Sequence, residues 1–72
     1  MIVKRGEAIR RITREAKRQG VRWHLDRQGA NHEVYRLGQT MVPVPRHGEL
    51  DDRFVEKLWK EREPELGESW WR

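Results

Sequence analysis

The sequence predicts an α+β fold, a two-layer sandwich in which two helices cover one face of a three-stranded antiparallel sheet. Three observations lead to this expectation. Apolar residues recur at helical spacing in the first third and last third of the chain, and they alternate with polar residues in between. Short turn signals separate the alternating segments. With 72 residues the chain has room for one domain with a thin core.

The first helix is expected over residues 7–19. Its apolar stripe repeats at spacings of three and four and consists of Ala8, Ile9, Ile12 and Ala16. Gly20 stands where a left-handed cap would end the helix, and Gly6 is the best available residue at its start.

Three strands are expected over residues 21–26, 32–37 and 40–45, with a turn at 27–31 and a two-residue hairpin turn at 38–39. Because proline cannot donate a backbone hydrogen bond, strand prolines belong on a sheet edge. Pro43 and Pro45 lie two residues apart and would turn toward the same edge. The third strand is therefore predicted to be an edge strand, and the strands are predicted to form a meander in sequence order.

Residues 46–50 are expected to form a loop, after which Asp51 or Asp52 caps a second helix that runs to residue 62. The apolar stripe of this helix consists of Phe54, Val55, Leu58 and Trp59. Pro64 is expected to end the helix. The order of helix, three strands and helix is that of double-stranded-RNA-binding domains.

We divide the chain into a folded domain, residues 1–62, and a C-terminal tail, residues 63–72. The tail contains Trp70 and Trp71, and an exposed tryptophan pair is unusual unless something covers it. The pair either folds back onto the small core, meets another protein or belongs to a disordered end. We favour folding back.

Composition excludes several classes of function. The chain has no cysteine, so it has neither a disulfide nor a thiolate nucleophile. No apolar run approaches the roughly 20 residues that span a bilayer, and the N-terminus lacks the apolar stretch of a signal peptide. The net charge is +4, with +6 in residues 1–36 and −2 in residues 37–72. This asymmetry favours a polyanionic partner, nucleic acid above all, and a cytoplasmic location is expected.

Two segments carry a resemblance to a known family. Residues 29–36, GANHEVYR, combine a glycine-containing turn with a histidine that opens a strand, followed by an aliphatic and an aromatic residue. Residues 42–47, VPVPRH, form an apolar-proline run that ends in basic residues, and Glu49-Leu50 then precedes a helix. Together these segments, in this order, resemble HicA-type toxins over roughly residues 4–62.

The resemblance implies an endoribonuclease that cleaves mRNA with one essential histidine, here His32, in a type II toxin–antitoxin system. It also implies a partner, a HicB-type antitoxin, with which the chain would form a hetero-oligomer. Two features depart from the family pattern. The first helix is about one turn longer than in short members, and Asn31 and Glu33 flank the histidine where many members have Ser or His. Glu33 would place a negative charge beside the site.

The residues can be interpreted for this chemistry directly. RNA carries its own nucleophile, the 2′-hydroxyl, so cleavage needs a base, an acid and positive charge near the phosphate, but no metal or other cofactor. Imidazole can serve in either proton transfer near neutral pH. One histidine supplies only one transfer at a time, and His47 is the better candidate for a second acid or a phosphate contact. The small turn residues Gly29, Ala30 and Asn31 would let a phosphate approach closely.

Strand alternation leaves two registers open. If Tyr35 and Leu37 face the helices, His32 and Arg36 share the open face with Arg22 and His24. In the opposite register Val34 is buried on the side of His32. We prefer the first register.

Candidate RNA-binding residues lie on the first helix, in the strands and after the third strand: Arg10, Arg14, Lys17, Arg22, Arg36, Arg46 and His47. The helical set, together with Arg18, is equally explained as the solvated face of an amphipathic helix. His32 is alternatively a solvated histidine at a strand end. A zinc site built from His24, His32 and His47 has no ligand spacing to recommend it.

Two other functions remain open at this stage. The chain could be a non-catalytic RNA-binding module of the same fold, which needs no His32. It could also be a protein-interaction domain that uses Trp70 and Trp71.

Overall fold

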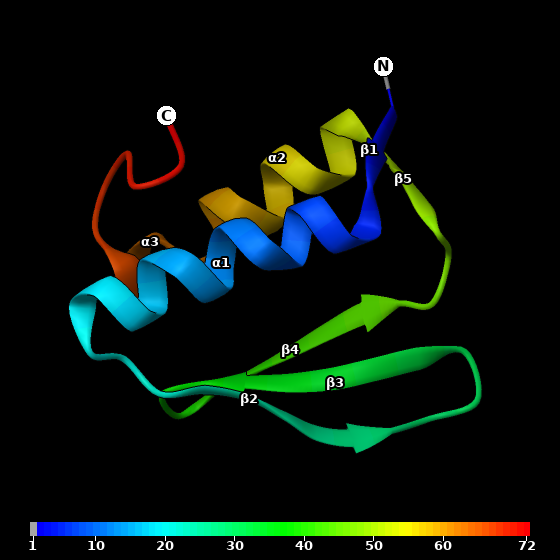
Figure 1. Cartoon of the computed structure of the whole chain (residues 1–72), viewed down its shortest axis with the longest axis horizontal. Coiled ribbons are helices and arrows are strands. Elements are labelled where there is room, and N and C mark those ends of the chain that lie inside the picture. Colours follow the sequence, from blue (N-terminus) through cyan, green and yellow to red (C-terminus); the bar gives the residue numbers. More distant parts are fainter. Residues whose placement is uncertain (1) are drawn as a thin grey trace.

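The computed structural model describes residues 2–72, with Ile2 described by its backbone alone. Two helices, α1 (Arg5–Gln19) and α2 (Asp52–Lys60), lie side by side over one face of a three-stranded sheet, and the other face of the sheet is uncovered (Figure 1). The structure therefore confirms the predicted α+β architecture, in which helices cover one face of a three-stranded antiparallel meander. None of the helices in residues 2–72 is long and apolar enough to cross a membrane.

Helix α1 runs over Arg5–Gln19 and begins two residues earlier than predicted. Lys4, not Gly6, is the residue at its start, and no side chain caps it. Gly20 ends the helix with φ of 72°, as predicted, because glycine adopts the left-handed conformation without steric cost. Ala8, Ile12 and Ala16 of the predicted stripe are buried.

The sheet consists of β2 (Trp23–Gln28), β3 (His32–Leu37) and β4 (Thr40–Pro45), antiparallel in the order β2-β3-β4. The predicted meander and the edge position of β4 are confirmed. Strand β2 begins two residues later than predicted because the backbone N–H of Val21 donates to the carbonyl of Ala16, which keeps Val21 in the helix cap.

The preferred register of β3 is also confirmed. Leu37 is completely buried and Tyr35 packs against the core, so both face the helices. Their neighbours across the strand pair, Thr40 and Val42, lie on the same face, and Val42 and Val44 are completely buried. Since side chains alternate, His32, Val34 and Arg36 lie on the open face.

A second, two-stranded sheet was not predicted. Strand β1 (Ile2–Lys4) pairs antiparallel with β5 (Glu49–Asp51), where the sequence suggested an uninterrupted loop. Each strand has only three residues, which is too short for an alternating pattern to show in the sequence. The backbone N–H of Arg5 also donates to the carbonyl of Gly48 at 2.9 Å, so the pairing fixes the loop after β4 against the start of α1.

Helix α2 covers Asp52–Lys60, and the carboxylate of Asp51 caps it by accepting a hydrogen bond from the N–H of Arg53 at 2.8 Å. The helix ends before the predicted residue 62. A further short helix, α3 (Glu63–Leu66), follows, with Pro64 in its first turn. Pro64 therefore starts a helix instead of ending one, because its fixed φ suits the first turn, where its missing N–H is not needed.

Residues 63–72, the C-terminal tail of the sequence analysis, pack against the rest of the described chain. Leu66 is buried in the main core, and Trp70 packs against that core. The indole N–H of Trp70 donates to the carbonyl of Trp59 at 2.8 Å, and that of Trp71 donates to Glu63 at 3.0 Å. Folding back, the preferred alternative for this tryptophan pair, is confirmed.

Candidate active site

His32 opens strand β3 and its side chain is exposed. The turn before it is tight, because the backbone N–H of Gly29 donates to the carbonyl of His32 at 2.7 Å. A Cβ on Gly29 would lie 3.2 Å from that carbonyl oxygen, so a larger residue fits only if the backbone moves slightly. The turn thus holds His32 at the end of the sheet.

His32 lies in an open hollow of about 440 Å³. The hollow is lined by residues of the β2–β3 hairpin and of the end of β4: Ala30, Asn31, His32, Pro45, Arg46 and His47. Two links bring these segments together. His32 pairs with Pro45 across the strands, and the backbone N–H of Arg46 donates to the carbonyl of Asn31 at 3.2 Å. The hairpin and the segment after β4 lie at the same end of the sheet (Figure 1).

The structure therefore brings together most of the residues predicted near the active site. Both His32 and His47 line the hollow, as do Arg46 and the two turn residues Ala30 and Asn31. A guanidinium N–H of Arg46 donates to the side-chain oxygen of Gln28 at 3.0 Å, which holds its cation beside the hairpin. Two imidazoles and a guanidinium at one hollow are the groups that acid–base chemistry at a phosphodiester needs.

Arg27 is a cation that sequence reasoning missed, because it was assigned to the turn. The register of β2 shifts between Leu25 and Arg27, so Arg27 pairs with Val34. Val34 faces the open side, and Arg27 therefore faces that side too, diagonally next to His32, where Cα atoms are about 7–8 Å apart. Only the bulge puts it there, since simple alternation from Leu25 would turn Arg27 toward the helices.

Glu33 does not put negative charge beside His32, contrary to the sequence expectation. It faces the helix side of the sheet and forms an ion pair with Arg5 of α1. The hydrogen bond from the Arg5 guanidinium lowers the pKa of the Glu33 carboxyl below its usual value of 4.5. Arg5 also donates to the carbonyl of Pro45 at 2.7 Å, which ties α1 to the strand end beneath the hollow.

Arg36 and Arg22 lie apart from the hollow. Arg36 is four residues from His32 along β3, about 13 Å at the usual strand rise. Its guanidinium is directed to Asp26, with an N–O distance of 3.7 Å, and it contacts the sulfur of Met41 at 3.4 Å. Arg22 is exposed before the start of β2. These two arginines share the open face of the sheet with His32 but not its site.

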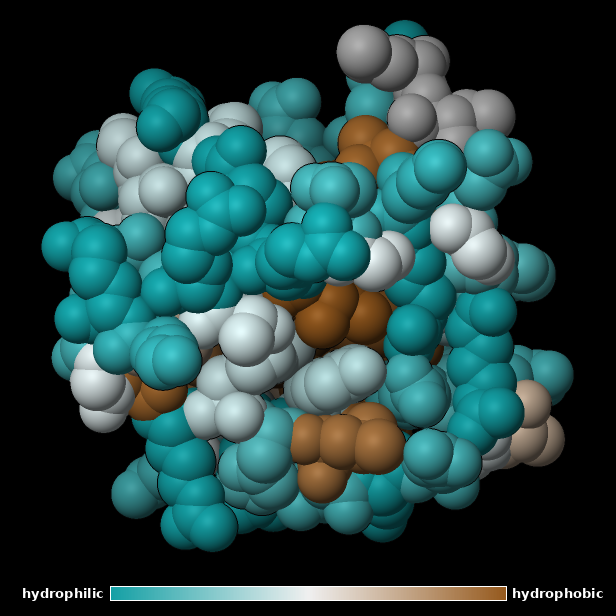
Figure 2. Space-filling model, viewed as in Figure 1, coloured by the Kyte–Doolittle hydropathy of each residue, from teal (hydrophilic) through white to brown (hydrophobic). Residues whose placement is uncertain are grey.

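The basic residues of α1 lie on the opposite side of the molecule. Arg10, Arg14 and Lys17 are exposed and stand opposite the buried stripe that faces the sheet. Arg10 pairs with Glu7 at 2.7 Å, and Arg18 pairs with Glu15. Arg14 and Lys17 make no ion pair or hydrogen bond with the side chains of residues 3–72. Hydrophilic residues cover much of the upper half of the view in Figure 2, and hydrophobic residues show below them near its centre.

The three histidines do not converge on one point. His24 lies on the edge strand β2 and pairs with Arg36 near the other end of the sheet, away from the hollow that His32 and His47 line. Across residues 2–72, no group of three His, Cys, Asp or Glu side chains is placed to hold a metal ion.

Comparison with known proteins gives no relative. No protein-family model, no curated protein and no solved structure matches the chain.

Proposed function

We propose that this protein is a metal-independent endoribonuclease that cleaves mRNA, the toxin of a type II toxin–antitoxin system of the HicA kind. One observation carries the proposal: His32, which opens β3, and His47, in the loop after β4, line a single hollow that is also lined by Arg46. The resemblance of residues 29–36 and 42–47 to HicA toxins supports the same activity. The arrangement of helices over a meander is compatible with the fold that this resemblance implies.

The two histidines provide the two proton transfers that RNA cleavage needs. One imidazole takes the proton of the 2′-hydroxyl as its oxygen attacks the adjacent phosphorus. The other imidazole, protonated, gives its proton to the 5′-oxygen as the bond from phosphorus to that oxygen breaks. The products are a 2′,3′-cyclic phosphate and a 5′-hydroxyl, and no water, metal or other cofactor is consumed.

Positive charge near the hollow supports this reaction. Arg46 is held at the hairpin by Gln28, and Arg27 stands beside His32 on the open face. A guanidinium can bind two oxygens of a phosphate and stabilise the charge that develops on them. The exposed cations of α1, Arg10, Arg14 and Lys17, lie on the side of the molecule opposite the sheet. They do not share a phosphate with the hollow, and we assign them to contacts with more distant parts of the RNA.

The proposed partner is a HicB-type antitoxin that forms a hetero-oligomer with the chain and covers the hollow. A toxin that acts on mRNA works in the cytoplasm, so we place the protein there. An acidic surface on the antitoxin would complement the +6 charge of residues 1–36.

The test is cleavage of RNA by the purified protein in the presence of a chelator. We expect wild-type protein to release fragments that end in a 2′,3′-cyclic phosphate. His32→Ala and His47→Ala should each lower kcat by roughly 10²–10⁴-fold while RNA binding is retained. His24→Asn is the matched control, since His24 lies outside the hollow, and should cleave normally.

If the wild-type protein binds RNA but does not cleave it, the nuclease proposal is wrong and the chain is a non-catalytic RNA-binding module. A protein that binds no RNA at any salt concentration would point to a protein-interaction domain, because phosphate contacts must strengthen as salt is removed.

A further inference from the structure

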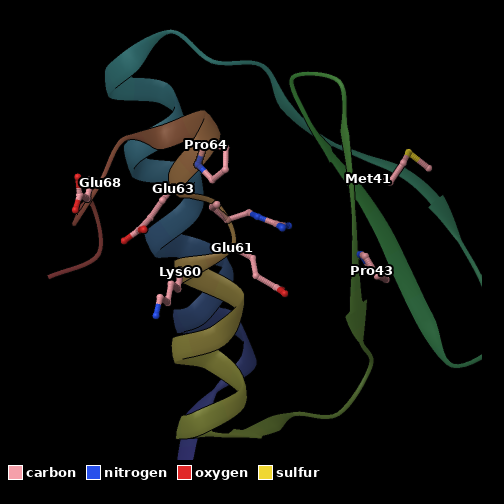
Figure 3. Close-up of a pocket in the computed structure, with 8 residues that line it drawn as sticks. Met41, Pro43, Lys60, Glu61, Glu63, Pro64 and Glu68 are labelled. Atoms are coloured by element: carbon pink, nitrogen blue, oxygen red, sulfur yellow. The ribbon is translucent and has the colours of Figure 1, made fainter.

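A second candidate site lies between the helices and the edge strand β4. Arg62, at the junction of α2 and α3, is the buried charged residue of this region, with only 8% of its surface exposed. It lines two hollows, one of about 800 Å³ and one of about 210 Å³. Both hollows also include Pro43 and Glu61, so they adjoin each other beside β4, and we refer to the two together as the groove. Figure 3 shows residues that line the larger hollow.

The guanidinium of Arg62 has no adequate partner within residues 2–72. Its Nε is buried without a hydrogen bond and lies 4.0 Å from Glu65 Oε1, which is also buried without one. The other oxygen of Glu65 is already used, because it accepts from the hydroxyl of Thr40 at 3.0 Å. Within residues 2–72 the terminal N–H groups of Arg62 make no hydrogen bond with protein atoms, and they do not belong to the buried atoms that lack a partner, so they reach solvent in the hollows. A buried Nε without an acceptor is costly, and an anion that enters the hollows would meet the terminal N–H groups.

The walls of the groove indicate what kind of anion. Beside Arg62, the smaller hollow is lined by four apolar residues and two charged ones: Val42, Pro43, Phe54, Leu58, Lys57 and Glu61. Phe54 is 38% exposed, although it was predicted to belong to the core stripe of α2. Apolar residues beside a guanidinium suit the carboxylate of an acidic side chain whose neighbours in the peptide are aliphatic.

A polyanion fits this groove poorly. The larger hollow carries three carboxylates, those of Glu61, Glu63 and Glu68, against the single amine of Lys60. In Figure 3, Glu61 points toward β4, which places its carboxylate at the approach to the groove. These carboxylates would repel the consecutive phosphates of RNA but tolerate one buried acidic side chain flanked by apolar residues.

The larger hollow is widely open to solvent, so a bound side chain can belong to a segment that continues beyond it. Pro43 and Pro45 leave the β4 edge short of backbone donors, so recognition must come from side chains, not from an added strand. We propose that Arg62 and the surrounding groove form a binding site for a glutamate or aspartate side chain in a segment of a partner protein. This site is separate from the His32 hollow and does not depend on RNA cleavage.

The test measures peptide binding by NMR on the whole chain. The probe is an acetylated, amidated pentapeptide Ala-Leu-Glu-Leu-Ala, and its control replaces Glu by Gln. We expect the glutamate peptide to bind at least tenfold more tightly and to shift the Nε–Hε resonance of Arg62, because a charge-assisted hydrogen bond is lost in the control. Arg62→Met should remove the difference between the peptides, whereas Arg53→Met, on the exposed side of α2, should preserve it.

Equal affinity of the two peptides would overturn the proposal, and the comparison on wild-type protein decides this even if Arg62→Met fails to fold. A resonance shift of equal size with sodium phosphate at matched ionic strength would also overturn it in favour of a phosphate site. Because His32→Ala protein should bind the peptide normally, failure of the proposed nuclease activity and failure of this site are distinguishable.

Discussion

The carboxylate of Glu33 lies against the guanidinium of Arg5, on the face of the sheet opposite His32. The phenol of Tyr35 donates to the same carboxylate at 3.3 Å. Glu33 thus joins α1 to β3 directly beneath the residue that we propose to be catalytic. Its charge serves the connection between the two layers, and the open face is left to positive groups.

Glu33→Gln should lower stability at neutral pH without altering RNA cleavage. The Arg5 hydrogen bond makes the pKa of Glu33 lower in the folded protein than its usual value of 4.5. Stabilisation by the carboxylate is therefore complete above about pH 4.5, and it is lost as the pH falls through the lowered pKa. Urea denaturation midpoints should differ between wild type and variant at pH 7, and the difference should shrink as the pH is lowered below the usual pKa of 4.5. A constant difference across this range would show that the charge is not responsible.

Arg27→Gln should weaken RNA cleavage by raising KM several-fold, because the variant loses one phosphate contact beside His32. The dependence of log Kd on log salt should become shallower by about one unit. Arg53→Gln, an exposed arginine of α2, is the control and should change neither quantity. Equal effects of the two substitutions would mean that only net charge matters.

Gly29→Ala should lower kcat by roughly tenfold to a hundredfold while costing at most about 1 kcal/mol of stability. A Cβ at this position meets the carbonyl oxygen of His32 at 3.2 Å, so the hairpin must shift and move the imidazole with it. Gly48→Ala is a matched control, because a Cβ there meets nothing within 4 Å. Cleavage rates and thermal melting curves of both variants provide the measurement, and an unchanged kcat in Gly29→Ala would contradict the predicted positioning role.

Trp70→Ala should destabilise the protein by about 3 kcal/mol, since a large side chain packed on the core is removed. The Trp70 ring also packs edge-on against Trp59, with 6.3 Å between ring centroids, and its N–H bond to the Trp59 carbonyl would be lost. For a domain of this size the melting temperature should fall by roughly 15 °C. Trp71→Ala removes a hydrogen bond to Glu63 and should cost less. Similar losses from both variants would show that the tail does not depend on Trp70.

Several elements of the fold could be predicted because their causes are local. The stripe of Ala8, Ile12 and Ala16 defines α1, and Gly20 ends it, since helical period and left-handed capping act within a few residues. The positions of Pro43 and Pro45 identify an edge strand for the same reason. Alternation places Tyr35 and Leu37 on the same face of β3, but it left open which face meets the helices.

Other elements could not be predicted because they depend on partners distant in the sequence. The β1–β5 pairing joins two three-residue segments that are far apart in the sequence, residues 2–4 and 49–51. Helix α3 and the packing of Trp70 depend on a core to which the first helix also contributes. Pro64 was expected to end α2, whereas it lies in the first turn of α3. The sequence does not distinguish these positions, because proline is common both just after a helix and in the first turn of the next one.

For the candidate site, the sequence by itself determined which chemical groups are available: His32 after a tight turn, His47 after an edge strand, and basic residues around both. Tertiary structure alone decided which of them meet. The pairing of His32 with Pro45 brings His47 and Arg46 to the hairpin, and the bulge in β2 turns Arg27 toward the open face. The physical reason is that periodicity fixes the face of a side chain within its own strand, whereas proximity between strands is set by register, which forms only when the sheet does.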